Sequence, residues 1–448
     1  MASHDEQALA WITAADMGLG HKRAAWPLRR WGRDGLVIAG SDADTSPNEL
    51  AQWSRLRRAY ESLSRMKSVP VVGNALFGMM DRLMAIPSSY PSRDLSRSTF
   101  QVHLVQRLIR KGLCGSFIER AKSEPLPIVT TFYAQAMAAE EAGFSRIYTV
   151  ICDADVNRVW VGPRPHESRV EYFVPCGKAL RRLRQYGVPD ERIYMTGFPF
   201  PLELIGDEKL STLKHDLGRR LARLDPNNRF WSLHHHSVAH FLGGRNCPKG
   251  RGLDVGPLTI TFAVGGAGAQ REIGDAIIRA LRARLAEGSV RVNLVAGRRL
   301  EVFEYFQARV EDLRRSIPEA AANVNIVYHA TDGGYFEAFN AALHDTDVLW
   351  TKPSELSFYA GLGLPVIMAP PIGSQEVRNR EWLQEVQAGI DQNDPEFTAE
   401  WLFDLLDAGR LAESAWDGFL KARKYGTYKV LEVLQTGTME RETSPLRR

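Results

Sequence analysis

The chain has 448 residues, of which 44% are hydrophobic and 25% are charged. This composition is ordinary for a globular protein, and the length exceeds what one hydrophobic core usually serves, so we expect two domains. Lys and Arg total 57 against 53 for Asp and Glu, and a formal net charge of only +4 argues against a nucleic-acid partner.

The cysteines and the chain start indicate the compartment. Cys114, Cys152, Cys176 and Cys247 form no CxxC pair, which excludes a zinc ribbon and a thioredoxin motif and favours reduced thiols. The opening "MASHDEQALA" lacks the basic-then-apolar pattern of a signal peptide. No run approaches the roughly 20 apolar residues that cross a bilayer. We therefore expect a cytoplasmic protein that is still able to touch a membrane surface.

Short apolar runs alternate with helical stretches along the whole chain. The first half contains "LAWITAA", "DGLVIAG", "LPIVTTF", "RIYTVICD", "VEYFVPC" and "RIYMTGF", and the second half contains "LTITFAVGG", "VRVNLVAG", "VNIVYHA", "TDVLWTK" and "LPVIMAPP". This pattern predicts parallel sheets covered on both faces. The predicted fold class is α/β, with two doubly wound, Rossmann-like domains whose ligand crevices lie at the carboxyl ends of the strands.

The same reading divides the chain into four parts. We expect a first domain at residues 1–205, a linker with an insertion at 206–255 and a second domain at 256–410. Residues 411–448 are expected to form a helix that crosses back to the first domain, followed by a tail.

A glycine turn lies near the N-terminus, in "WITAADMGLGHKRAAWPL". Gly18 and Gly20 follow a predicted buried strand, and His21 opens a helical stretch. Strand, glycine turn and helix N-terminus is a layout that binds anions or diphosphates, although a purely structural turn has the same pattern.

Two carboxylates follow a strand in "TVICDADVNRVWV". Asp153 and Asp155 could position an acceptor at this strand end, or they could cap the next helix.

The stretch from Gln52 to Ala121 mixes basic residues with apolar ones, among them Phe77 and Met80. Basic amphipathic helices of this kind dock on anionic lipid surfaces, although core helices with solvated arginines have a similar composition.

Four histidines gather in "LHHHSVAH", where His236 and His240 could share a helix face as in zinc sites. The pair lacks a glutamate and a clear third ligand. An exposed linker surface is therefore favoured for His234–His240, and we expect no metal site.

A second glycine loop lies in "ITFAVGGAGAQREIGDAI". Gly265, Gly266 and Gly268 would let the backbone approach a ligand, and the helix that starts near Gln270 would aim free N–H groups at a phosphate. The alternative is a tight turn between strand and helix.

Polar residues follow two strands in "TDVLWTKPSELSFYAGLGLPVIMAPPIGSQEVRNREWL". Ser354 and Glu355 come after the first strand, and Gln375, Glu376 and Asn379 come after the second. All could point into the ligand crevice. For Glu355 the alternative is a carboxylate that stabilises the first turn of its own helix.

Taken in order, five segments resemble the two-domain (GT-B) glycosyltransferases of the family 28 type. The family includes monogalactosyldiacylglycerol synthases and the N-acetylglucosaminyltransferase of peptidoglycan synthesis. The segments are "GLGHKRAA", "TVICDADVNRVWV", "VPCGKALRRLRQYGVPDERIYMTGFPF", "GGAG" and "GLGLPVIM" with "GSQEVRN". The resemblance covers most of residues 9–405, with a divergent linker.

The resemblance implies inverting transfer of a sugar from a nucleotide diphosphate sugar to a lipid or lipid-like hydroxyl, in a cleft between the domains. It implies no cofactor beyond the nucleotide-sugar co-substrate. Together with the basic and apolar stretch, it makes a cytoplasmic protein that is peripheral on the inner face of the membrane the expected location. It makes His21 the candidate base and puts Asp153, Asp155, Phe77 and Met80 on the acceptor side. Candidate donor-binding residues are Gly18, Gly20, Gly265, Gly266, Gly268, Arg298, Ser354, Glu355, Gln375, Glu376 and Asn379.

One departure from the family concerns the nucleotide ribose. Phe358 stands where the family keeps the glutamate that holds the ribose. Glu355 lies three residues earlier, on the same face of a helix, and is the hypothetical substitute. A nucleotide-sugar epimerase or hydrolase on the same fold, and a non-catalytic nucleotide-binding relative, remain as alternatives.

Overall fold

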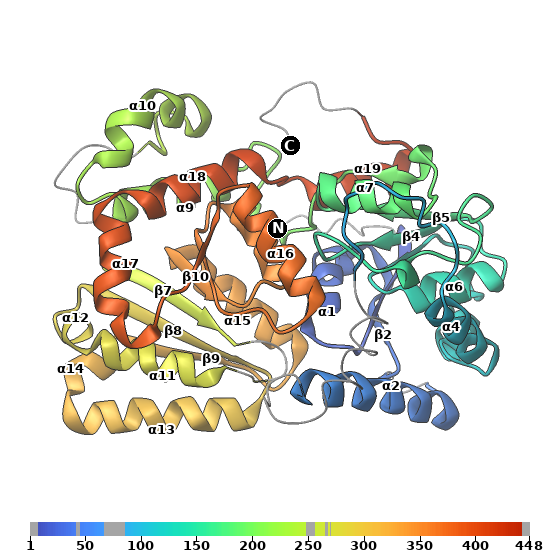
Figure 1. The fold of residues 1–448 in the computed structure, drawn as a ribbon, viewed down its shortest axis with the longest axis horizontal. Helices are drawn as coiled ribbons and strands as arrows, with labels where there is room; N and C mark the ends of the chain where they lie inside the picture. Colours follow the sequence, from blue (N-terminus) through green and yellow to red (C-terminus); the bar gives the residue numbers. More distant parts are fainter. Residues whose placement is uncertain are drawn as a thin grey trace.

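The strands of the chain form two separate parallel sheets (Figure 1). The computed structural model describes residues 8–41, 45–66, 86–247, 256–264, 268 and 270–440. Each sheet has six strands within these ranges. The predicted α/β class with two doubly wound sheets is therefore confirmed.

The first sheet has the strand order β2-β1-β3-β4-β5-β6 in the described residues. Alternate residues of β1 face two different cores, with Trp11 on one side and Ile12 on the other. Burial on both faces explains why these strands are apolar without alternation. The strands are β1 Ala10–Ala15, β2 Gly32–Ala39, β3 Ile128–Thr130, β4 Ile147–Val150, β5 Val170–Phe173 and β6 Ile193–Tyr194.

The second sheet has the order β12-β11-β10-β7-β8-β9 in the described residues. The strands are β7 Leu258–Ala263, β8 Val290–Gly297, β9 Val324–Tyr328, β10 Val348–Thr351, β11 Val366–Met368 and β12 Gly389–Asp391. The order reverses between β7 and β10, which is where doubly wound sheets open a ligand crevice. The sequence did not predict β12, because this edge strand has three residues and no apolar run.

Helices cover both faces of the first sheet. They are α1 Leu19–Ala25, α2 Pro47–Met66, α4 Phe100–Arg110, α5 Gly115–Ala121, α6 Tyr133–Glu141, α7 Gly177–Gln185 and α8 Leu202–Ile205, with the 3-10 turns η1 Trp26–Trp31, η2 Arg158–Trp160 and η3 Asp190–Arg192. The first sheet with α1–α8 is called the first unit below.

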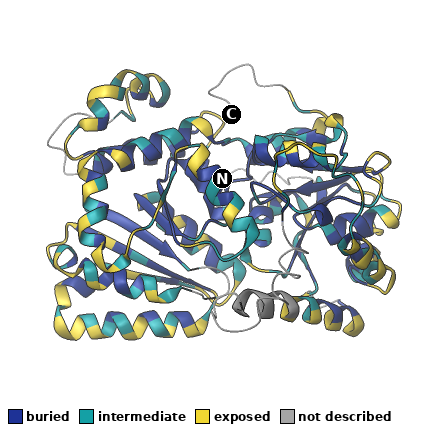
Figure 2. Cartoon of the chain, in the orientation of Figure 1, coloured by how far each residue is buried: buried dark blue, intermediate teal, exposed yellow. Residues whose placement is uncertain are grey.

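The remaining helices surround the second sheet or follow it. They are α9 Ser211–Leu224, α10 Arg229–Leu242, α11 Arg271–Ala280, α12 Arg282–Ala286, α13 Leu300–Ser316, α14 Pro318–Ala321, α15 Asp332–Asp345, α16 Ser374–Glu385, α17 Thr398–Asp407, α18 Arg410–Lys421 and α19 Gly426–Thr436, with η4 Glu355–Leu362 and η5 Pro395–Phe397. The second sheet with η4, η5 and α9–α18 is called the second unit. Figure 2 shows both sheets buried and the outward faces of the surrounding helices exposed.

The last helix returns to the first sheet. Val430, Val433 and Leu434 of α19 belong to the same buried cluster as Ile12 of β1. Arg146, just before β4, donates a hydrogen bond from Nη2 to the Leu434 carbonyl at 2.8 Å. Helix α19 therefore covers the face of the first sheet that faces away from α6 (Figure 1).

Helix α9, inside the range expected to be a linker, is bound firmly to the second unit. The buried Arg220 guanidinium donates to the carbonyls of Thr346 at 2.7 Å and Leu362 at 2.8 Å. Arg223 pairs with the buried Asp347 at 2.8 Å. This part of 206–255 is thus a structural element of the second unit, while the domain boundaries at 205 and 256 stay predictions.

Helix α10 carries the four histidines and projects from the body of the molecule (Figure 1). Across the described ranges, no group of three or more His, Cys, Asp or Glu residues is placed to hold a metal ion. None of the helices in these ranges is both long enough and apolar enough to cross a bilayer.

The contact between α9 and α15 predicts a pH-dependent contribution to stability. The His344 Nδ1 atom lies 2.6 Å from Oδ2 of Asp216, and this hydrogen bond raises the pKa of His344 above its usual value. A raised folded-state pKa adds stability that is fully present below the unfolded pKa of about 6.5 and is lost as the pH rises through the raised value. His344→Gln should therefore lower the melting temperature more at about pH 5.5 than at about pH 9. Asp216→Asn should show the same trend, and a pH-independent difference for both variants would contradict the assignment.

Candidate functional site

The loop after β1 touches the start of η4, so the two units meet at the carboxyl ends of their strands. A Cβ atom added to Gly20 would lie 2.8 Å from Oε2 of Glu355. Gly18 precedes α1 with φ at 112°, which favours glycine. A side chain at position 20 would therefore displace the Glu355 carboxylate. Its predicted contact with a donor stays a prediction.

Arg23 of α1 inserts its guanidinium into the second unit. Nη2 donates to the Tyr335 hydroxyl at 2.6 Å, and Nε lies 3.2 Å from Oε1 of Glu355. The guanidinium carbon lies 4.5 Å from the ring centre of Phe339 and 5.1 Å from that of Phe336. A desolvated cation over aromatic faces contributes about 2 kcal/mol or more. The helix that begins beside His21 is therefore fastened to α15 and η4.

This contact revises the expected role of Glu355. Its side chain is only 13% exposed and forms an ion pair with Arg23. Neither expected role, ribose ligand or partner of its own helix, describes a carboxylate that is paired across the two units. Ser354 accepts a hydrogen bond from the Leu356 N–H and so caps η4. A donor contact by either residue stays a prediction.

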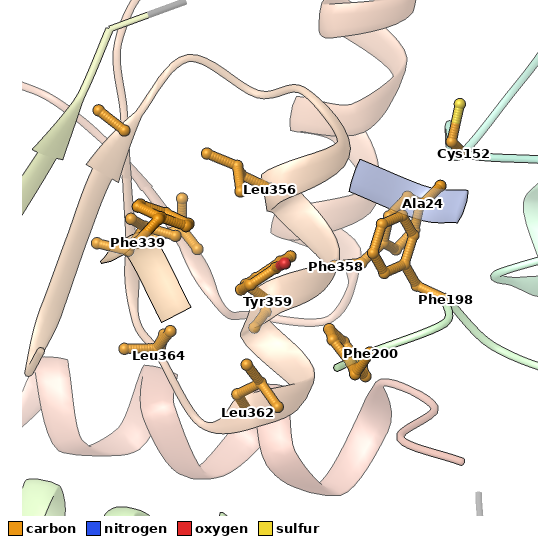
Figure 3. Close-up of a cluster of buried hydrophobic side chains, with 14 of the residues drawn as sticks. Ala24, Cys152, Phe198, Phe200, Phe339, Leu356, Phe358, Tyr359, Leu362 and Leu364 are labelled. Atoms are coloured by element: carbon orange, nitrogen blue, oxygen red, sulfur yellow. The ribbon is translucent and has the colours of Figure 1, made fainter. Parts of the chain in front are cut away.

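Phe358 is a core residue. Its ring stacks on Phe198 with centres 5.3 Å apart and planes at 15°, and it contacts Trp382 at 4.8 Å. Figure 3 shows Phe358 on the side of η4 that faces Phe198, Ala24 and Cys152. The aromatic side chain at this position therefore packs the two units together.

His21 is held in one tautomer. Its Nδ1 atom lies 2.8 Å from the Thr131 carbonyl, which can only accept, so Nδ1 carries the hydrogen and the lone pair is on Nε2. The ring packs edge-on against Phe132, with centres 5.0 Å apart, and Sγ of Cys152 lies 3.4 Å from Nδ1. Burial lowers the pKa of His21, although the Thr131 hydrogen bond and Glu355 oppose the shift. The imidazole is thus neutral near pH 7, and in the described part of the chain Nε2 forms no hydrogen bond.

Asp153 and Asp155 have different environments. Asp153 accepts a hydrogen bond at Oδ1 from Nδ2 of Asn379, at 2.9 Å. Burial raises the pKa of Asp153 to about 6, against the effect of that hydrogen bond. Asp155 is instead locked by Arg182 through two hydrogen bonds of 2.7 and 2.9 Å, and both side chains are 1% exposed. Asp155 therefore ties the segment after β4 to α7, and its acceptor-side role stays a prediction.

Two residues of α16, Glu376 and Asn379, have partners within the protein, and their donor contacts stay predictions. Glu376 accepts hydrogen bonds at Oε2 from the N–H groups of Ile372 and Gly373, just before α16, and its other oxygen pairs with Lys352. Asn379 is fully buried and uses its whole amide on partners in the protein. Gln375 remains half-buried at the start of α16, and its donor contact stays a prediction.

Arg298, expected on the donor side, belongs to an ion-pair network between the units. Its Nη1 atom lies 2.7 Å from Oδ1 of Asp332, and Lys22 of α1 lies 3.0 Å from Oδ2 of the same residue. Lys22 also pairs with Asp16, which follows β1. The network fastens α1 to the N-terminus of α15.

The second glycine loop is described in part. Gly268 has φ at 72°, and a Cβ atom there would lie 3.2 Å from Cδ of Arg299. Gly265, Gly266, Phe77 and Met80 lie outside the described residues. Their expected roles stay predictions.

Three comparisons show what the chain is similar to. A family model described as a domain of unknown function (DUF6938) matches residues 250–433. A search of curated proteins finds no match. Acinetobacter baumannii MurG is 12% identical, with 95% of this chain and 99% of that chain covered and a TM-score of 0.47.

Two other solved structures are similar at the same level. A UDP-GlcNAc 2-epimerase from Neisseria meningitidis bound to UDP-GlcNAc is 11% identical, with 94% and 98% covered and a TM-score of 0.44. A UDP-glucosyltransferase from Polygonum tinctorium is 13% identical, with 95% and 98% covered and a TM-score of 0.46. At these identities and scores, the function has to be argued from the site itself.

The Arg23 contact leads to a prediction about stability. Arg23→Met leaves the Glu355 carboxylate buried without its cation, which costs about 3 kcal/mol in the free energy of unfolding. Arg29→Met is the matched control, because the Arg29 guanidinium lies 3.6 Å over the ring of Trp26 within its own unit. The Arg29 side chain is half-exposed, so Arg29→Met should lower the free energy of unfolding by less than about 1 kcal/mol. Urea denaturation measures both, and equal costs would contradict the interpretation.

Proposed function

We propose that the protein is a glycosyltransferase that moves a sugar from a nucleotide diphosphate sugar to an acceptor hydroxyl. The observation that carries the proposal is His21: a neutral imidazole, oriented by the Thr131 carbonyl, with Nε2 unoccupied at the strand ends where the two units meet. A base in this protonation state is suited to remove a proton from a hydroxyl near neutral pH. Asp153 supports the proposal, because its Oδ2 atom forms no hydrogen bond within the described residues.

The proposed reaction is a displacement with inversion. Nε2 of His21 takes the acceptor proton as the acceptor oxygen forms its bond to the anomeric carbon. The bond from that carbon to the diphosphate oxygen breaks on the opposite face, and the nucleoside diphosphate leaves with the electron pair. The N-terminus of α11, which begins at Arg271, would stabilise the leaving charge through backbone N–H groups. The proposal includes no cofactor besides the donor.

The acceptor is proposed to be a lipid or lipid-like molecule that is reached from an anionic membrane surface. Helix α4 supports this part, because Phe100 and Leu104 are 62% and 40% exposed, one turn apart. Arg107 and Arg110 are exposed on the same helix. An apolar pair beside basic residues is typical of helices that lie on anionic bilayers. The apolar cluster around residues 71–80 lies outside the described residues.

Sugar transfer differs from the alternatives in what it consumes. An epimerase or hydrolase would turn over the nucleotide sugar without an acceptor, and a non-catalytic relative would bind it without turnover. Donor consumption measured with and without lipid therefore distinguishes all three. We expect consumption that depends on the lipid.

The role of His21 is tested by substitution. His21→Ala should lower the transfer rate by about 10²–10⁴-fold, the usual contribution of a general base, while a nucleoside diphosphate still raises the melting temperature. His240→Ala is the control, because this exposed histidine lies on α10. Turnover of His21→Ala within a few-fold of wild type would reject the role.

The membrane contact is tested with vesicles of phosphatidylglycerol at low ionic strength. We expect co-sedimentation that salt weakens, and a clear loss of binding in the double variant Phe100→Ser/Leu104→Ser. Phe397→Ser is the control, because Phe397 is 55% exposed but lies on the second unit. Equal binding of both variants would remove the lipid-facing role from α4.

A further inference from the structure

Asn379 of α16 joins the second unit to the end of β4 in the first. Its side chain is fully buried. Oδ1 accepts the Ala154 N–H at 2.7 Å, and Nδ2 donates to Oδ1 of Asp153 at 2.9 Å. Nδ2 also lies 3.3 Å from the Pro353 carbonyl, which it donates to. One amide therefore contacts two consecutive residues of the other unit, one as acceptor and one as donor.

The chemistry of these partners requires an amide at this position. The Ala154 N–H needs an acceptor and the Asp153 carboxylate needs a donor, and an asparagine side chain supplies both. An aspartate at 379 would have no donor and would repel Asp153. An alanine would leave the N–H group and the carboxylate oxygen without this partner.

Burial is the main cause of the raised pKa of Asp153, and the other causes come from side chains of the second unit. The Asn379 hydrogen bond and Lys352 lower this pKa, and Glu355 and Glu376 raise it. All four belong to the second unit, whereas the carboxylate itself follows β4. Asn379 is the member of this group that bonds Asp153 directly.

We propose that Asn379 is a positioning residue that couples contact between the two units to the orientation of Asp153. With Oδ1 held by Asn379, Oδ2 is the oxygen left for a substrate hydroxyl, and it has this orientation only while α16 is seated against the first unit. The inference rests on the proposed function, because it takes Asp153 to act on a substrate.

The direction of the expected effect follows from the hydrogen bond. Its donor stabilises the ionised carboxylate, so the Asp153 pKa should rise above about 6 when the donor is removed. A reaction that needs ionised Asp153 then loses rate on the acid side. In Asn379→Ala the acid limb of kcat/KM should move upward by about one pH unit, as expected for one hydrogen bond to a charged group.

Asn340→Ala is the matched control. Asn340 of α15 is also buried and also bonds across the units, donating to Oε1 of Glu203 in α8 at 2.9 Å. Asn340→Ala should lower the stability of the protein without moving the acid limb of kcat/KM.

In the Asp153→Asn background, Asn379→Ala should cause no further change in the pH profile of kcat/KM. An unchanged acid limb in Asn379→Ala, or the same shift in Asn340→Ala, would overturn the inference.

A second measurement needs no enzymatic activity. Because Asp153 has a raised folded-state pKa, wild type should lose stability relative to Asp153→Asn as the pH rises from about 4 to about 6. In the Asn379→Ala background this loss should continue to a higher pH, and in the Asn340→Ala background it should not. If the wild-type protein transfers no sugar, the proposed function fails while this titration still tests the contact. If the titration window is the same in both backgrounds, the inference fails while sugar transfer can stand.

Discussion

The burial of one guanidinium, that of Arg23, constrains how the two units face each other. A buried cation needs compensation, and here the Glu355 carboxylate, the Tyr335 hydroxyl and several aromatic faces supply it, all from the second unit. Because Arg23 lies two residues after His21, this compensation also fixes the histidine loop relative to the second sheet. If the units separate, the Arg23 charge either becomes exposed to solvent or stays buried without its partners. The contact between the units is therefore specific in its geometry.

The contacts around Arg23 differ in how readily solvent can replace them. The Asp332 carboxylate that joins Lys22 and Arg298 is 25% exposed, so water and salt can compete for these ion pairs. Arg23 is 3% exposed, and Asn379 is fully buried. The interface therefore has a dry centre that sets the geometry and a wetter rim whose strength depends on ionic conditions.

The sequence allowed the strands to be predicted, because burial on both faces leaves a continuous apolar run that can be read locally. It also indicated which polar residues lie at strand ends. It did not indicate their partners: Arg23 and Glu355 are 332 positions apart, and Asp153 and Asn379 are 226 apart. No periodicity links such positions. Glu355, Glu376 and Asn379 were therefore expected to face a ligand, whereas the structure satisfies them with the Arg23 guanidinium, the capped N–H groups of α16 and the end of β4.

Nε2 of His21 and Oδ2 of Asp153 are among the side-chain atoms that form no hydrogen bond in the described residues, and both belong to the first unit. They are the two such atoms to which the proposed reaction assigns a role. The side chains that hold their surroundings in place, Glu355 opposite Arg23 and Asn379 opposite Asp153, belong to the second. The Thr131 carbonyl, in the first unit, orients His21, whereas Asn379, in the second unit, holds Asp153. Of the two side chains to which the proposal assigns chemistry, Asp153 is therefore the one whose orientation depends on how the second unit is seated.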